Sequence, residues 1–141
     1  MGLQIALEGL NRYESHLLNT AVQLHSFVDG VGSSAVGILL DTYHMNIEEE
    51  DLAGAIRTAG DRLFLFHVAD SNRRAVGRGH IPLSAILRGL EQTDYPGPII
   101  VECTAPGPDP FTTMKGPGWY EQTVDGAQKS IHELRRLEGA S

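Results

Sequence analysis

Residues 36–44, VGILLDTYH, decide the fold, because an apolar run stops at an aspartate and a histidine follows three positions later. The run shows no polar alternation, which is typical of a strand buried on both faces of a parallel sheet. Three other runs share this character, namely LQIAL at 3–7, LFLF at 63–66 and PIIV at 98–101. We therefore predict four strands at these positions.

Helical patterns follow each of the predicted strands. Residues 16–28 place their apolar side chains on one side, and Gly30 is the expected end of that helix. A third helix is predicted to begin at Pro82 and to run through Leu90, and a fourth to span about 118–137.

The second helix is expected to start within the acidic segment after VGILLDTYH. Asn46 can cap it, with Glu49 three residues later as the partner of a capping box, and Gly60 can end it. The acidic run 48–51 would then lie in the first turn, where the helix dipole favours negative charge.

The order of these elements is a strand followed by a helix, four times. Such alternation predicts an α/β protein with a parallel sheet and right-handed crossovers. Four units make either a small open sheet or half of an eight-unit barrel, which usually needs ~250 residues. Since the first strand begins at residue 3 with no lead-in, we favour the half-barrel and treat residues 1–141 as a single domain.

Composition excludes several classes of function. The chain has 141 residues and a net charge of −7, and its eleven basic residues are scattered, which argues against a nucleic-acid partner. No apolar stretch is long enough to span a membrane, so no membrane association is expected. Cys103 is the single cysteine, so no internal disulfide can form and we expect a reducing, cytoplasmic location.

Each predicted strand ends in a residue that can bind a metal: Glu8, Asp41, His67 and Glu102. Taken singly, each acid could be a helix cap or a loop residue, and the histidine could be a packed side chain. The carboxyl ends of parallel strands share one rim, however, so all four side chains should converge there. Three carboxylates and one imidazole suit Mn²⁺, Mg²⁺ or Co²⁺ at least as well as Zn²⁺.

Two longer motifs, LDTYHMNIEE at 40–49 and HVADSNR at 67–73, carry a family resemblance. With ALEGLNRYE at 6–14 and PIIVEC at 98–103, they resemble the second half of the xylose isomerase-like TIM-barrel superfamily of sugar phosphate isomerases and epimerases. Within that superfamily the chain is most similar to the D-tagatose 3-epimerase, or ketose 3-epimerase, type. The resemblance implies the C-terminal (βα)4 half of a (β/α)8 barrel, with the N-terminal half absent.

The resemblance also implies residue roles. It makes Glu8, Asp41, His67 and Glu102 the ligands of one divalent metal, most often Mn²⁺, and makes the two glutamates the acid/base pair. It further implies substrate contacts for Glu14, His44 and Arg73. The implied activity is metal-dependent epimerisation or isomerisation of a sugar or sugar phosphate through an enediolate, since a metal and paired carboxylates suit proton abstraction beside a ketone.

Two alternatives remain open on the sequence alone. The chain could be an inosose dehydratase-like lyase of the same superfamily, or a catalytically incomplete half-barrel that only binds metal. A half-barrel would expose two sheet edges, so we expect it to form a homo-oligomer or to associate with a complementary half-barrel.

Overall fold

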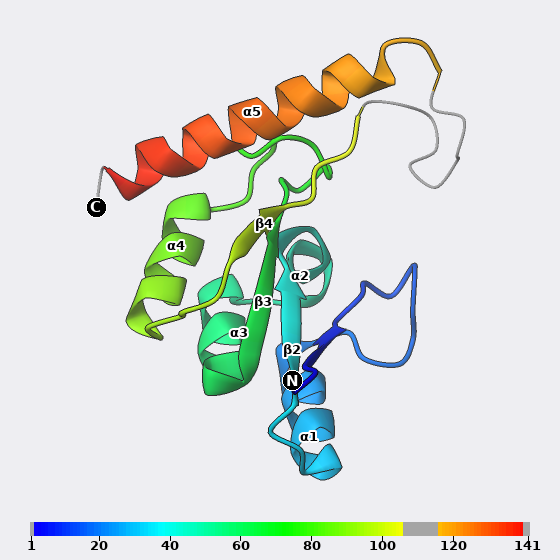
Figure 1. The fold of residues 1–141 in the computed structure, drawn as a ribbon, viewed down its shortest axis with the longest axis vertical. Helices are drawn as coiled ribbons and strands as arrows, with labels where there is room; N and C mark the ends of the chain where they lie inside the picture. The colour runs from blue at the N-terminus through cyan, green and yellow to red at the C-terminus, as the bar shows by residue number, and fades with distance from the viewer. Residues whose placement is uncertain (1, 106–115, 140–141) are drawn as a thin grey trace.

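The computed structural model describes residues 2–105 and 116–139, which form four parallel strands and the helices that connect them (Figure 1). The sheet order is β1-β2-β3-β4, so neighbours in sequence are neighbours in space. This confirms the predicted α/β alternation. The bounds are β1 Ile5–Glu8, α1 Ala21–Val31, β2 Val36–Asp41, α2 Thr42–Glu48, α3 Leu52–Ala59, the 3-10 turn η1 Gly60–Arg62, β3 Leu63–Val68, α4 Leu83–Gln92, β4 Ile99–Val101 and α5 Trp119–Glu138.

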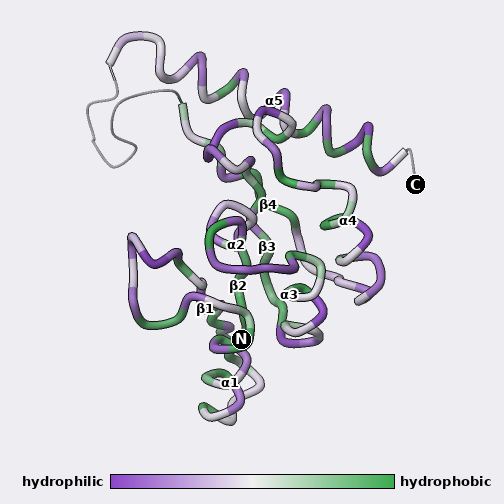
Figure 2. The backbone as a smooth tube through the Cα atoms, turned by 180° about the vertical axis from the view of Figure 1, so that it is seen from behind, coloured by the Kyte–Doolittle hydropathy of each residue, from purple (hydrophilic) through white to green (hydrophobic). Residues whose placement is uncertain are grey.

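The hydrophobic core lies between one face of this sheet and the helices. On that face, β2 contributes Ile38 and Leu40, and β3 contributes Phe66 and Val68, all of them buried. Buried side chains of α1, α3 and α4 complete the same cluster. Figure 2 shows β2 and β3 as hydrophobic segments, whereas α5 alternates along its length. Burial under helices therefore explains the apolar residues on one face of these strands, which are every second residue along each of them.

The opposite face of the sheet carries the predicted metal ligands at its carboxyl end. Asp41 pairs in register with His67, while Glu8 pairs with Leu39, two residues before Asp41. Because side chains two residues apart on a strand share a face, Glu8, Asp41 and His67 all project from one side. Ile100, the register partner of His67, is 41% exposed on that side. The half-sheet thus leaves its inner face open.

A close contact between strands explains the glycine in VGILL. A Cβ atom at Gly37 would overlap the ring of Phe64 on the neighbouring strand. The ring occupies the space that a side chain would need, and the β2–β3 register shifts between Ile38 and Leu39 beside it. Gly37 is therefore a packing requirement of the sheet.

Helix α1 begins later than predicted. Residues 16–20 lie outside it, because Thr20 forms a capping box with Gln23 and sets the first turn at Ala21. Gly30 does not end the helix; the chain continues to Gly32, whose φ of 67° makes it the left-handed C-cap. The expected span of 16–28 was therefore wrong at both ends.

The predicted second helix is two helices, and its expected cap was wrong. Asn46 lies inside α2, which is capped instead by Asp41, whose side chain accepts a hydrogen bond from the Tyr43 N–H. A second helix, α3, starts after Asp51, which caps it by accepting from the Gly54 N–H. The expected ending at Gly60 is confirmed, since Gly60 is the C-cap of α3.

The remaining helices follow the prediction closely. Pro82 is the N-cap of α4, and α5 spans Trp119–Glu138 against the predicted 118–137. In the part of the chain that the structure describes, none of the helices is both long and apolar enough to cross a membrane.

Candidate metal centre

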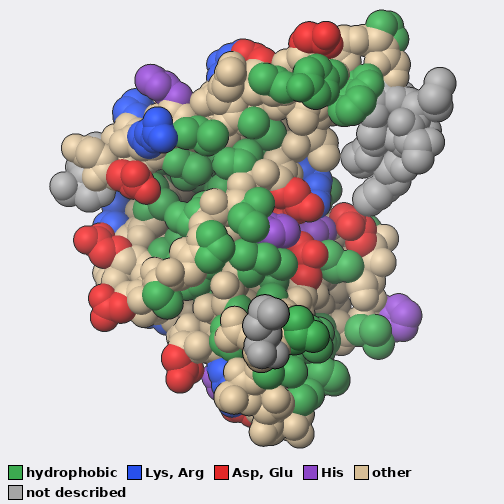
Figure 3. All heavy atoms as spheres, in the orientation of Figure 1, with side chains coloured by type: hydrophobic (Ala, Val, Ile, Leu, Met, Phe, Trp, Pro, Cys, Tyr) green, Lys and Arg blue, Asp and Glu red, His purple; other side chains and the backbone are tan. Residues whose placement is uncertain are grey.

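The structure brings the four predicted strand-end residues together. Glu8, Asp41, His67 and Glu102 each offer one ligand atom, and these atoms lie within 4.8 Å of one another. His67 Nδ1 is 3.3 Å from Glu102 Oε2, 3.8 Å from Glu8 Oε1 and 3.9 Å from Asp41 Oδ2. Figure 3 shows acidic and histidine side chains gathered near the middle of the face, with hydrophobic side chains beside them.

Two oxygens of this cluster lack partners in a way that suits a cation. Asp41 is fully buried, and its Oδ1 accepts the Tyr43 N–H at 2.6 Å, so one oxygen holds the helix cap. Among the described residues, Asp41 Oδ2 and Glu8 Oε1 are buried side-chain oxygens with no hydrogen-bond partner. Unpaired buried oxygens are costly, and a divalent ion would satisfy them. The residues present therefore fit a metal.

The pKa shifts of the carboxyl groups in the cluster also favour a bound cation. Burial, followed by the neighbouring Glu102 carboxyl group, raises the pKa of Asp41 to about 7. Burial and the charge of Glu102 also raise the pKa of Glu8. Burial works against ionisation of Glu102 as well, but the Asp41 carboxyl and then the Arg73 guanidinium lower its pKa. Two of the three carboxyl groups, those of Asp41 and Glu8, therefore resist ionisation, and a bound cation would favour their charged forms.

Arg73 supplies the one guanidinium that contacts this cluster among the described residues. Its Nη2 donates to Glu102 Oε2 at 2.8 Å, and its Nη1 lies 3.2 Å from His44 Nε2. The guanidinium also lies 4.8 Å from the centre of the Tyr43 ring, within cation–π range. The backbone of Arg73 has a φ of 57°, and its carbonyl accepts hydrogen bonds from the Thr104 N–H and hydroxyl. The strained turn is thereby tied to the chain beyond β4.

His44 and Glu14 reach the site from different elements. His44 lies on α2 and is 1% exposed, while Glu14 lies in the loop after β1. Burial, and then the Arg73 charge, lower the pKa of His44. A fully buried asparagine, Asn11, donates its side-chain N–H to Glu14 Oε1 at 2.9 Å and lies 2.8 Å from His44 Nδ1. One asparagine thus links the two side chains.

The loop that carries Asn11 is fastened to α2 by Arg12. The Arg12 guanidinium binds Glu48 at 2.9 Å, and the Arg12 N–H donates to the same carboxylate at 2.5 Å. Glu48 therefore acts as an anchor for the loop, which is a different role from the helix-start charge expected for the run 48–51. This contact fixes the loop after β1 relative to His44.

All seven residues predicted for the site lie at this rim, but three contributors were missed. Asn11, Tyr43 and Asp70 were not singled out, although each lies within one of the motifs. Asp70 is buried, and its Oδ1 accepts the N–H groups of Ser71 and Ile81, which folds the loop that holds Arg73. A sequence signal existed only for Asp70, since aspartate commonly accepts backbone N–H groups in turns.

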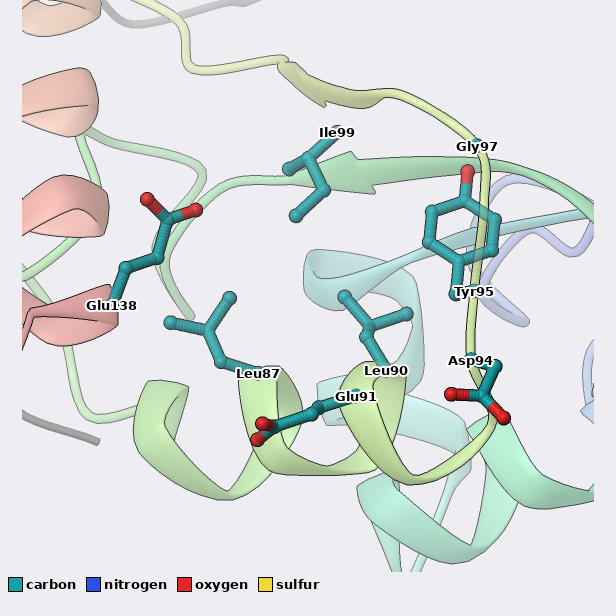
Figure 4. A pocket seen from close by; sticks show the side chains of 8 residues that line it. All are labelled: Leu87, Leu90, Glu91, Asp94, Tyr95, Gly97, Ile99 and Glu138. Carbon is teal, nitrogen blue, oxygen red and sulfur yellow. The ribbon is translucent and has the colours of Figure 1, made fainter.

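A separate groove lies on the helix-covered side of the sheet (Figure 4). Its volume is about 600 Å³, and it lies between α4, the start of β4 and the end of α5. Apolar side chains and three carboxylates line it, at the end of β4 opposite to Glu102. The groove contains none of the predicted site residues; its lining is Leu87, Leu90, Glu91, Asp94, Tyr95, Gly97, Ile99 and Glu138.

Comparison with known proteins gives a consistent set of relatives. The family described as "Xylose isomerase-like TIM barrel" matches residues 1–132. The chain is 46% identical over 102 residues to D-psicose 3-epimerase of Agrobacterium fabrum, covering 72% of this chain and 35% of that protein. It is 42% identical over 101 residues to L-ribulose 3-epimerase of Methylomonas sp., covering 72% of this chain and 35% of that protein.

A solved structure gives the same relation in three dimensions. The crystal structure of a D-psicose 3-epimerase in the presence of D-fructose superposes with a TM-score of 0.85 at 35% identity. The match covers 96% of this chain and 50% of the other. The chain therefore spans about a third of the curated relatives by sequence and half of a related barrel by structure.

Proposed function

Because the chain belongs to the xylose isomerase-like TIM barrel family, we propose that it carries the metal-binding half of a ketose 3-epimerase. The observation that carries this proposal is the convergence of Glu8, Asp41, His67 and Glu102 from four strands on one small volume. The names of the relatives support a ketose as substrate, and the related crystal structure was obtained in the presence of D-fructose. Epimerisation at C3 is the reaction that these relatives share by name.

We assign one divalent ion to the four residues, with Mn²⁺ as the first candidate and Mg²⁺, Co²⁺ or Zn²⁺ as alternatives. A bound ion would supply a Lewis acid that stabilises negative charge developing on oxygen atoms of the sugar. The mixed donor set, three carboxyl groups and one imidazole, supports an ion of intermediate hardness.

The two glutamates are proposed to move the protons. Removing the C3 proton of a ketose leaves an enediolate, which a carboxylate on one side of the sugar can generate and an acid on the other side can reprotonate. Glu8 and Glu102 belong to the two outermost strand ends, β1 and the end of β4, so they flank the position above Asp41 and His67. Return of the proton to the opposite face inverts C3.

Arg73, His44 and Glu14 are proposed to hold the sugar. Arg73 and His44 present nitrogen atoms at the edge of the cluster, 3.2 Å apart, and Glu14 lies beside His44 with its Oε1 4.0 Å from Nδ1. Donors and an acceptor placed together in this way suit a polyhydroxylated substrate, which offers both kinds of group.

We also propose that a second half-barrel covers the open face. In the described residues, β1 and β4 each pair on one side only, and Ile5 on β1 is 56% exposed. Because family relatives are about twice as long in structure, the covering unit is either a second copy or the four-unit half that those relatives contain. The far wall of the substrate pocket would come from it.

The proposal is tested by looking for C3 chemistry directly. The chain, loaded with Mn²⁺, is incubated with D-fructose in D₂O, alone and with the N-terminal half of a related D-psicose 3-epimerase. We expect the C3 epimer by chromatography and deuterium at C3 by NMR. Glu102→Gln should lower the rate by about 10²-fold or more, while Glu121→Gln, on exposed α5, should leave it unchanged.

The outcomes separate the competing functions. A dehydrated sugar in place of the epimer would support the lyase. Turnover only when the second half is supplied would support the incomplete half-barrel. A metal-loaded assembly of both halves that produces no epimer and no C3 deuterium would overturn the epimerase assignment.

A further inference from the structure

The imidazole of His44 has surroundings that determine which of its nitrogens carries the proton. Its Nδ1 is 3.1 Å from the backbone N–H of Asn11 and 2.8 Å from the Asn11 side-chain nitrogen. Both groups are donors, and the shorter contact comes from the side-chain nitrogen, so Nδ1 accepts while that amide N–H faces it. An imidazolium, or a ring protonated at Nδ1, would place a third N–H against these two donors.

The orientation of the Asn11 amide is fixed independently of His44. Asn11 Oδ1 accepts the backbone N–H of Tyr13 at 2.9 Å, which requires the oxygen on that side. The amide nitrogen then faces the Glu14 carboxylate at 2.9 Å with one hydrogen and His44 Nδ1 with the other. Turning the amide over would set an oxygen against the carboxylate and two N–H groups against each other.

The ring proton must therefore lie on Nε2, on the side of the metal centre. Arg73 Nη1 lies 3.2 Å from this nitrogen and can only donate. Glu8 Oε1 is 3.9 Å from Nε2, which is beyond hydrogen-bond distance. Two N–H donors thus face each other at an almost fully buried position, and an oxygen atom with two lone pairs would satisfy both.

From this geometry we propose that Asn11 is a positioning residue, which fixes His44 as the neutral Nε2–H tautomer. His44 and Arg73 then form a two-donor site for one oxygen acceptor of the substrate. The identity of that oxygen as a sugar oxygen rests on the proposed function, but the tautomer does not. Asn11 acts through His44 and does not itself touch the cluster of ligand atoms.

The tautomer can be measured in the chain without metal or sugar. Long-range ¹H–¹⁵N correlation spectra of histidine-labelled protein distinguish an accepting Nδ1 from a protonated one, and a His44→Gln variant assigns the signal. We expect the Nε2–H pattern in the parent. In Asn11→Asp, an acceptor replaces the side-chain donor at similar size, so the signal should shift toward the Nδ1–H form.

The matched control is Asn46→Asp, which makes the same chemical change two residues from His44 on the same helix and outside this network. It should leave the parent tautomer in place. A parent signal of the Nδ1–H form, or an unchanged Nε2–H signal in Asn11→Asp, would overturn the proposal.

The effect of Asn11 on catalysis is measured in a separate experiment. With D-fructose, Asn11→Asp should lower kcat/KM by about tenfold, the scale of one misdirected hydrogen bond, and Asn46→Asp should not. If the parent shows the predicted tautomer but no epimerisation, the proposed function fails and the role of Asn11 stands. If the parent epimerises the sugar but shows the Nδ1–H form of His44, the proposed function stands and the role of Asn11 fails.

Discussion

Asp41 combines two tasks at a single buried carboxyl group. One oxygen caps α2 through the Tyr43 N–H, and the other points without a partner toward Glu8, His67 and Glu102. An asparagine could perform the first task but would bring no negative charge to the second. An aspartate at a position that is 0% exposed is therefore suited to a cluster that binds a cation.

This gives a pH-dependent prediction for the metal-free chain. Because burial raises the pKa of Asp41 from an ordinary value near 3.8 to about 7, the folded chain holds this proton more tightly than the unfolded chain. The stabilisation from this bound proton is complete below pH 3.8 and is lost as the pH rises through about 7. In EDTA, the free energy of unfolding of Asp41→Asn should therefore be higher than that of the parent by roughly 2 to 4 kcal/mol at pH 8. Near pH 4 the two free energies should be equal.

Chemical denaturation at each pH measures this difference in the free energy of unfolding. Asp61→Asn, an exposed change in η1, is the control and should reproduce the parent profile. Equal pH dependence in the parent and in Asp41→Asn would show that the pKa of Asp41 does not change on folding, and would contradict the prediction.

At the scale of elements, the acidic run 48–51 shows how tertiary contacts reassign charges. Glu48 binds Arg12 of the loop after β1, and Glu49 accepts the N–H of Ala21, the first residue of α1, at 2.6 Å. Only Asp51 caps the helix that directly follows it. The predicted benefit of negative charge at a helix start is present, but for Glu49 the helix is α1 rather than its own.

A pair of alanine substitutions tests this reassignment. Glu49→Ala removes the acceptor at the start of α1 and should lower the free energy of unfolding by about 1 kcal/mol, the usual value of a lost cap. Glu50→Ala, at the exposed neighbour in the same run, should change it by less than about 0.5 kcal/mol. Thermal or denaturant unfolding measures both free energies. Equal losses in the two variants would show that Glu49 does not cap α1.

The elements also show what sequence can predict. All four strands were found because their residues are apolar at almost every position, as in VGILL and LFLF. The start of α1 was missed because apolar Leu17 and Leu18 continue the helical spacing into the preceding loop, while Thr20 and Gln23 end it. The break after Glu48 was missed because two caps, Asp41 and Asp51, compete with the single cap that Asn46 offered.

The site was predictable to the extent that topology determines it. A parallel sheet brings strand ends together, so Glu8, Asp41, His67 and Glu102 followed from their positions after apolar runs. The burial of Asn11 and the contact of Arg73 with His44 depend on how two loops fold over the rim. No local spacing in the sequence encodes these contacts.

At the scale of the whole molecule, the described residues form a sheet with two open edges and an uncovered inner face. Ile100 lies on that face in edge strand β4, and it is 41% exposed. Exposed apolar surface beside an unpaired edge favours association with another sheet. The proposed second half-barrel would cover this surface and the rim together.

Sedimentation velocity tests whether this face is the contact. We expect concentration-dependent association of the chain, weakened about tenfold or more by Ile100→Lys, which places a charge in the apolar contact. Ile131→Lys is the matched control, since Ile131 is 44% exposed but lies on α5. Equal weakening by both variants, or a parent that stays monomeric at about 100 µM, would exclude the inner face as an interface between copies of this chain.

The proposed centre requires that four strand ends bind one divalent ion. Calorimetric titration with Mn²⁺ measures this without any sugar or second half-barrel. We predict one site per chain, an affinity that rises with pH as the carboxyl groups ionise, and a loss of about 100-fold or more in His67→Asn. His25→Asn, on the surface of α1, should bind like the parent. A parent that takes up no ion at neutral pH, or a His67→Asn variant that binds as tightly as His25→Asn, would contradict the central claim.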